Sequence, residues 1–94
     1  MEKIKRLILI EFQEIFEHLR NKYGQEEGDR RLSDLNKIIE NAYVLFDGDE
    51  EKIVKWLMSD NSRWFNVSPF NMAVGGAGDK VVKFQEELLG IIGD

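Results

Sequence analysis

The sequence predicts an all-α fold, a small compact domain of about five helices. Apolar residues recur at helical spacing along most of the 94-residue chain, no segment alternates polar and apolar residues for more than a few positions, and glycines or capping residues separate the helical segments. Because the chain has no cysteine, its core has to come from apolar packing, for which 43% hydrophobic residues suffice. We therefore expect one domain over residues 1–94.

The first predicted helix covers residues 3–23 and is amphipathic over about five turns. Its apolar stripe comprises Ile4, Ile8, Phe12, Ile15, Phe16, Leu19 and Tyr23. Leu7 and Ile10 lie outside this stripe, so the first turns are apolar on more than one side, and we expect homodimerisation through these two residues. Gly24 is the predicted stop of the helix. The polar segment 25–31, which contains a second glycine, is predicted to be a turn.

Two further helices are predicted in the middle of the chain. Apolar residues at helical spacing indicate a helix over residues 32–46, with Gly48 just after it. Asp49 is expected to cap a short third helix, since Glu50 and Glu51 follow in the first turn, where the helix dipole favours acidic side chains. The polar residues 59–62 are expected to end that helix.

The last two predicted helices are separated by glycines. Ser68 followed by Pro69 predicts a helix start, because the missing N–H of proline costs nothing at the first helical position. We expect this short helix to run to about Ala73 and to break at residues 75–76. The final helix is predicted from residues 78–79 to Ile92. A phosphate-binding loop is disfavoured at these glycines, because Asp79 stands where the Walker pattern has lysine.

Charge and composition exclude several classes of function. The formal net charge is −5 and the basic residues are scattered, which argues against nucleic-acid binding by the protein on its own. The longest apolar run is far shorter than the about 20 residues of a membrane span, and no signal peptide is recognisable, so we expect a cytoplasmic protein. His18 is the only histidine, so we predict no metal site, no cofactor and no enzyme activity.

The aromatic residues around the third predicted helix suggest a binding surface. Trp56 is spaced like a core residue, whereas Trp64 and Phe65 are adjacent in an irregular segment and do not easily face one core together. Either one packs inward and the other covers the core, or one stays exposed on a rigid turn and anchors a protein partner. Arg63 fits the second interpretation, since arginine and aromatic residues dominate binding hot spots. A third possibility is a small-ligand pocket lined by Trp56, Trp64 and Phe84.

An ordered set of short motifs extends over residues 42–93. It comprises Ala42, Phe46 and Gly48, the pair Trp56 and Leu57, Asn61, the segment Phe65 to Phe70, and a final helix with Val81, Leu88 and Ile91. This order resembles the toxin-binding domain of the Xre/MbcA/ParS antitoxins. Ser62 and Asn66 stand where that family has proline and glycine. Residues 1–41, which we predict to be a helical N-terminal extension, lack the helix-turn-helix region usual in the family.

The resemblance implies an antitoxin-like protein that binds and inhibits a RES-type toxin, an enzyme that acts on NAD. It also implies that the final helix and C-terminus approach the toxin's active site, which assigns blocking roles to Leu89, Ile92, Gly93 and Asp94. Trp64, Phe65, Pro69 and Phe70 are implied to shape the remaining contact surface. The alternative hypothesis is a self-associating structural or regulatory module without a toxin partner.

Overall fold

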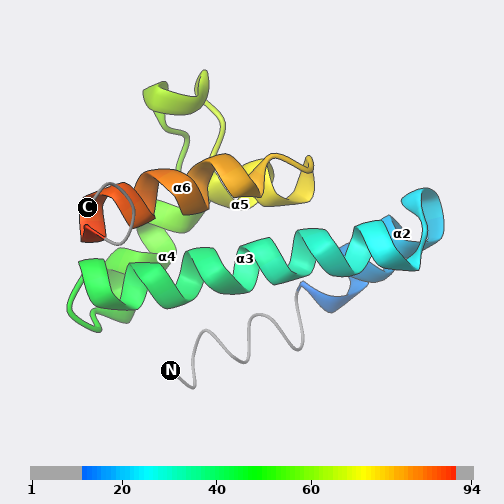
Figure 1. The fold of residues 1–94 in the computed structure, drawn as a ribbon, viewed down its shortest axis with the longest axis horizontal. Helices are drawn as coiled ribbons and strands as arrows, with labels where there is room; N and C mark the ends of the chain where they lie inside the picture. Colours follow the sequence, from blue (N-terminus) through cyan, green and yellow to red (C-terminus); the bar gives the residue numbers. More distant parts are fainter. Residues whose placement is uncertain (1–11, 91–94) are drawn as a thin grey trace.

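The computed structural model describes residues 12–90 of the chain. Helices dominate this range, and the predicted all-α class is confirmed (Figure 1). Five α-helices and one 3-10 helix lie within it: α2 (Gln13–Tyr23), α3 (Gln25–Leu45), α4 (Glu50–Met58), η2 (Ser62–Trp64), α5 (Pro69–Val74) and α6 (Gly78–Leu89).

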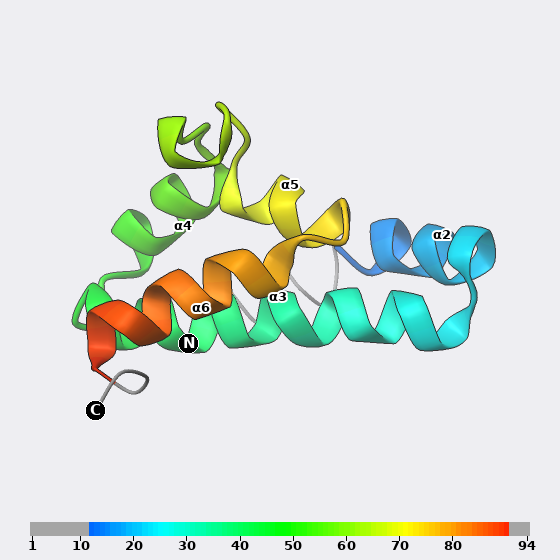
Figure 2. The same ribbon diagram turned by 45° about the horizontal axis from the view of Figure 1, so that its top comes forward.

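The 21-residue helix α3 is the centre of the arrangement. Helix α2 folds back along the first half of α3, whereas α6 lies beside its second half, and α4 and α5 cover a further side (Figures 1 and 2). The side chain of Gln85 in α6 is buried and donates a hydrogen bond to the backbone oxygen of Ile38, at 2.9 Å. This bond fixes how α6 lies against α3.

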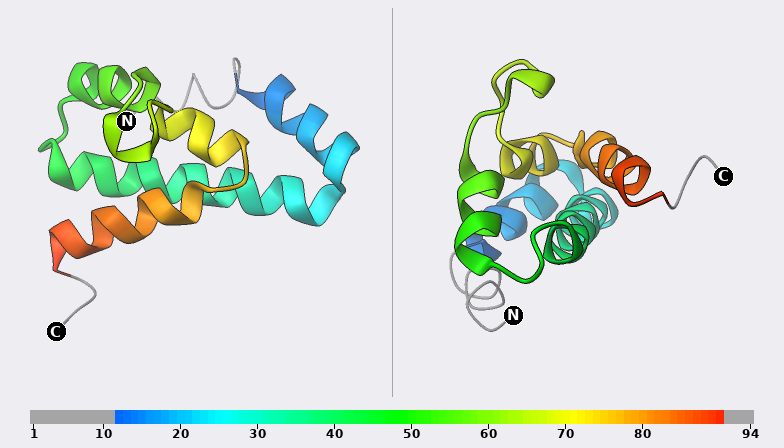
Figure 3. Two further views of the ribbon diagram at one scale, coloured as in Figure 1. Left: turned by 90° about the horizontal axis from the view of Figure 1, so that it is seen from above. Right: turned by 90° about the vertical axis from the view of Figure 1, so that its left-hand side faces the viewer.

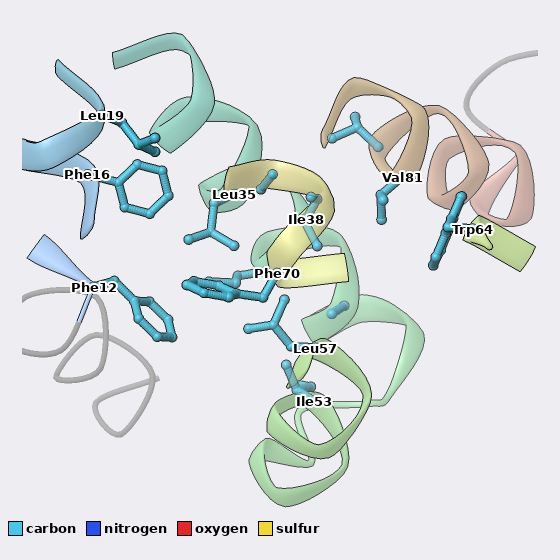
Figure 4. Packing of buried hydrophobic residues seen from close by; sticks show 14 residues of the cluster. Phe12, Phe16, Leu19, Leu35, Ile38, Ile53, Leu57, Trp64, Phe70 and Val81 are labelled. Atoms are coloured by element: carbon cyan, nitrogen blue, oxygen red, sulfur yellow. The ribbon is translucent and has the colours of Figure 1, made fainter. Parts of the chain in front are cut away.

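The core consists of apolar side chains from all of these helices. Leu35 and Ile38 of α3 are fully buried, and the rings of Phe12 and Phe70 pack with their centroids 4.4 Å apart (Figure 4). The cluster comprises Phe12, Phe16, Leu19, Leu35, Ile38, Ile39, Ala42, Ile53, Leu57, Trp64, Phe70, Ala73, Val81 and Val82. Burial of these side chains is the main stabilising contribution that the chain has available, since it contains no cysteine.

The turn predicted over residues 25–31 is wrong, because these residues form the first turns of α3. Gly24 alone makes the connection from α2, with a φ of 97° that favours glycine. Gly28 lies against Arg20 of α2 so closely that a Cβ atom there would stand 2.4 Å from the Arg20 Cγ and 2.9 Å from its Cα. The close approach of α2 and α3 therefore depends on this helical glycine.

Charged pairs also stabilise the start of α3. Arg20 Nε lies 2.7 Å from the Asp29 carboxylate, which ties α2 to α3. Glu27 accepts hydrogen bonds from Arg30 and Arg31 within the helix, and these bonds lower the pKa of Glu27 to about 2. Arg31 also donates to the backbone oxygen of Val74 at 3.0 Å, so that α3 is linked to the end of α5.

The helix starts predicted from capping residues are confirmed. The Asp49 side chain accepts a hydrogen bond from the backbone N–H of Lys52, which makes it the N-cap of α4. Ser68 accepts in the same way from the N–H of Asn71 at 3.1 Å, and Pro69 is the first residue of α5.

The glycine-rich turn before α6 is also confirmed, but the end of α6 is not where we expected it. Helix α5 ends at Val74, and α6 begins at Gly78. The final helix was expected to reach Ile92, yet α6 ends at Leu89 because Gly90 adopts a left-handed C-cap conformation with a φ of 73°. Ile92 lies outside the described residues.

Only part of the first predicted helix falls within the described range. Phe12 lies in a bend and is the N-cap of α2, so the described helix begins at Gln13 and is shorter than the predicted five turns. The predicted dimerisation residues Leu7 and Ile10 lie outside the described residues. Among residues 12–90, no helix is both long and apolar enough to cross a membrane.

Candidate functional site

Residues 61–67, which we call the 61–67 loop, connect α4 to α5 and project from the body of the helices (Figures 1 and 3). The loop is closed by its own backbone. Asn61 N–H donates to the Val67 oxygen at 3.3 Å, and the N–H groups of Trp64 and Asn66 donate to the Asn61 oxygen at 3.1 and 2.9 Å. The Asn61 side chain accepts from the Arg63 N–H at 2.9 Å. These bonds close the loop on itself.

The tip of the loop has an unusual backbone. Phe65 and Asn66 both have positive φ values, 56° and 62°. The Val67 N–H donates to the Trp64 oxygen at 3.1 Å, which closes a turn of the I′ kind around them. Asparagine tolerates this region, whereas for phenylalanine it carries a conformational cost of about 1–2 kcal/mol. Phe65 is therefore held in a strained position by the contacts on either side of it.

Trp64 provides the main contact that anchors the loop. Its side chain, labelled in Figure 4, is 7% exposed and packs edge-on against Phe84 of α6, with ring centroids 5.6 Å apart. On its other side lies Trp56, at 6.4 Å, which in turn contacts Phe46 at 5.9 Å. We call Phe46, Trp56, Trp64 and Phe84 the aromatic ladder. Of the three residues of the predicted ligand pocket, Trp64 therefore contacts both of the others, Trp56 and Phe84, through its ring.

Arg63 adds a second contact to the same ring of α6. Its guanidinium carbon lies 4.0 Å from the centre of the Phe84 ring, within the range of a cation–π interaction. The residue itself remains exposed. Arg63 thus helps to fix the loop and still presents its charged group to solvent.

Phe65 has the opposite environment from Trp64. Its side chain is 94% exposed, the highest value among the large apolar residues in the described range. Fully burying such a ring would stabilise the fold by about 1.5–3 kcal/mol, and the exposed position of Phe65 does not provide this stabilisation. Neither its backbone conformation nor its exposure serves the stability of the isolated protein.

Comparisons with known proteins do not assign this loop. No protein-family model, curated protein or solved structure matches the chain. Within residues 12–90, no three His, Cys, Asp or Glu side chains lie where they could hold a metal ion together. Inferences about function therefore rest on the geometry of the loop and its surroundings.

The structure separates the predicted partner-binding residues into two groups. Arg63 and Phe65 are accessible, as a contact surface requires. Trp64, Pro69 and Phe70 are buried, so they could shape such a surface only from beneath, and their role in partner binding stays a prediction. Pro69 and Phe70 begin α5 with their side chains in the core, where Phe70 meets Phe12.

The predicted blocking residues lie at and beyond the end of α6. Leu89 is the last residue of this helix and is half-buried. Gly93 and Asp94, like Ile92, lie outside the described residues.

Sequence reasoning missed a groove on the outer side of Trp56. This feature, which we call the α4 groove, has a volume of about 330 Å³ and is lined by Phe46, Lys52, Lys55, Trp56, Ser59, Asp60 and Asn61. Four of these residues stand at positions i, i+3, i+4 and i+7 of one helical face, a signal that the sequence does contain. The groove lies at the base of the 61–67 loop.

Proposed function

We propose that this chain is a protein-binding module that binds a partner enzyme through the 61–67 loop, with Phe65 as the central contact residue and Arg63 beside it. One observation carries this proposal: Phe65 is 94% exposed on a hydrogen-bonded turn, where its φ is positive. Residues held in sparsely populated backbone conformations cluster at functional sites. An exposed aromatic ring at such a position fits a pocket on another protein.

The rigidity of the loop favours binding. A flexible loop loses conformational freedom when it binds, at a cost of about 0.5–1.5 kcal/mol for each immobilised side chain. In this protein the backbone bonds of Asn61 and the burial of Trp64 have already fixed the loop before a partner arrives. Arg63 contributes a charge that can pair with a carboxylate of the partner.

The resemblance of residues 42–93 to the toxin-binding domain of Xre/MbcA/ParS antitoxins supports a specific partner. On this basis we propose that the partner is a RES-type toxin and that binding inhibits its consumption of NAD. The resemblance implies that Leu89 and Ile92 to Asp94 would approach the toxin's active site. The Asp94 carboxylate suits a site that binds an anionic nucleotide, because both anions pair with the same basic groups.

A comparison of three tagged full-length chains tests the proposal: wild type, Phe65→Ser, and Val44→Ser as a matched control. Val44 is an exposed apolar residue of α3 and does not belong to the 61–67 loop. We expect the wild type and the Val44→Ser variant to recover a NAD-consuming enzyme from lysate of the native host in near-equal molar amounts. The Phe65→Ser variant should bind that enzyme at least about 30-fold more weakly, as expected for a hot-spot residue.

Inhibition distinguishes an antitoxin from a passive binding protein. The purified enzyme should lose its NAD-consuming activity when one equivalent of the wild-type chain is added, and should keep it when residues 93–94 are removed from the chain. Equal recovery of the enzyme by Phe65→Ser and wild type would contradict the role of the loop. Recovery of only the protein itself would favour the self-associating module.

A further inference from the structure

The α4 groove has a chemical character of its own. Its floor consists of Phe46 and Trp56, both half-buried, whose ring planes are tilted by 53° to one another. Lys52 and Lys55 line its edge from one face of α4. Neither lysine forms an ion pair with another residue of the described range 12–90.

The charge of the groove is opposite to that of the chain. Lys52 and Lys55 are its two cations, and Asp60 is the one carboxylate among its lining residues, all of which are described. The lining therefore carries a net charge of +1, whereas the whole chain carries −5. An extended acidic polypeptide would be repelled by the chain as a whole. A single carboxylate would respond mainly to the nearby lysines, because screening limits charge interactions to about 8 Å at physiological salt.

We propose that the α4 groove binds a small aromatic carboxylate. The ring of the ligand would lie on Phe46 and Trp56, and its carboxylate would accept charge-assisted hydrogen bonds from Lys52 and Lys55. The volume of about 330 Å³ falls at the lower end of the range for small-molecule sites. An apolar floor with a few convergent polar groups is also the usual composition of such sites.

This site does not depend on the proposed partner enzyme. Phe65 is not among the residues that line the groove, so a Phe65→Ser variant should bind the ligand as the wild type does. The two proposals can therefore fail separately.

Two probes of nearly identical shape, 2-naphthoate and its neutral amide 2-naphthamide, test the role of charge. Each is titrated into the ¹⁵N-labelled full-length chain and followed by NMR. We expect saturable shifts at the backbone amides of Lys55, Ser59 and Asn61 and at the Trp56 indole N–H. Naphthoate should bind roughly fivefold more tightly than naphthamide, with a dissociation constant of the order of 1 mM for a site this open.

The double variant Lys52→Met/Lys55→Met tests whether these two lysines bind the carboxylate of the ligand. Its affinity for naphthoate should fall roughly fivefold, to the level for naphthamide, while naphthamide binding persists and shows that the fold is intact. Lys37→Met/Lys80→Met removes the same charge from α3 and α6 and should bind naphthoate as the wild type does. Equal affinity for both probes would overturn the proposal, and so would shifts that do not saturate or that arise elsewhere in the chain. Unchanged naphthoate binding in the Lys52→Met/Lys55→Met variant would also overturn it.

Discussion

Trp64 and Phe65 are consecutive residues whose side chains are 7% and 94% exposed. The positive φ of Phe65 turns the backbone between them, so that one ring enters the aromatic ladder while the next faces solvent. The buried ring holds the loop, and the exposed ring is free to meet a partner. This division of roles leads to opposite expectations for stability and binding at the two positions.

Replacing Trp64 with alanine should destabilise the fold by about 3–5 kcal/mol, because it removes a buried indole from between Trp56 and Phe84. Urea unfolding followed by circular dichroism measures this loss. The Trp64→Phe variant keeps a smaller ring and should lose about 1–2 kcal/mol, which gives a measurable value if the alanine variant does not fold. Phe65→Ala is the control and should change stability by less than about 0.5 kcal/mol. Similar losses at both positions would contradict the assigned roles.

Asparagine at position 65 should stabilise the isolated protein while weakening partner binding. Asparagine adopts positive φ more readily than phenylalanine, so Phe65→Asn should gain about 0.5–1 kcal/mol and raise the melting temperature by about 2–8 °C. Phe65→Ser loses the same exposed ring without this backbone preference. A melting temperature for Phe65→Asn no higher than that of Phe65→Ser would show that the turn carries no strain.

Alanine at position 28 should destabilise the protein, although alanine is normally the better helix former by about 1 kcal/mol. A Cβ atom there would meet backbone atoms of Arg20 at 2.9 Å, so α2 and α3 would have to separate. We expect a net loss of about 1–3 kcal/mol in urea unfolding. Ser33→Ala, at an exposed position of the same helix, should instead be neutral or slightly stabilising. A gain in stability at position 28 would contradict the close approach of the two helices.

The interaction of Glu27 with Arg30 and Arg31 predicts a pH dependence. These hydrogen bonds lower the pKa of Glu27 from 4.5 to about 2 in the folded protein. The ionised carboxylate therefore contributes fully to the free energy of unfolding at pH values above the pKa that Glu27 has in the unfolded chain. This contribution is lost as the pH falls towards 2. Thermal unfolding of wild type and Glu27→Gln should therefore differ most above about pH 5 and converge towards pH 2. A constant difference across this range would show that the carboxylate charge is not involved.

Much of the fold could be predicted from the sequence because its signals are local. The N-caps Asp49 and Ser68 accept hydrogen bonds from residues three positions further along, so each cap could be predicted from the residues next to it in the sequence. Residues 25–31 were mistaken for a turn because their composition is polar and includes Gly28. The contact that requires this glycine comes from Arg20 in another helix. The spacing of Glu27 from Arg30 and Arg31 was the available signal for a helix.

The candidate site could be predicted only in part. Adjacent aromatic residues at 64 and 65 indicated that the two rings do not easily face one core together, but periodicity does not say whether either ring is exposed or which one, since the loop is irregular. The choice depends on Phe84, which reaches the loop from α6. The α4 groove was missed for a similar reason, because its floor combines Trp56 with Phe46 from beyond the end of α3.

The aromatic ladder contains both tryptophans of the chain. Intrinsic fluorescence therefore reports on the ladder and the base of the 61–67 loop, whereas far-ultraviolet circular dichroism reports on the helices as a whole. If the loop detaches from Phe84 before the helices unfold, the emission spectrum will change at a lower temperature than the ellipticity does. The protein thus carries a built-in optical probe of its own loop, one that needs no label and responds little to events at the distant turn between α2 and α3.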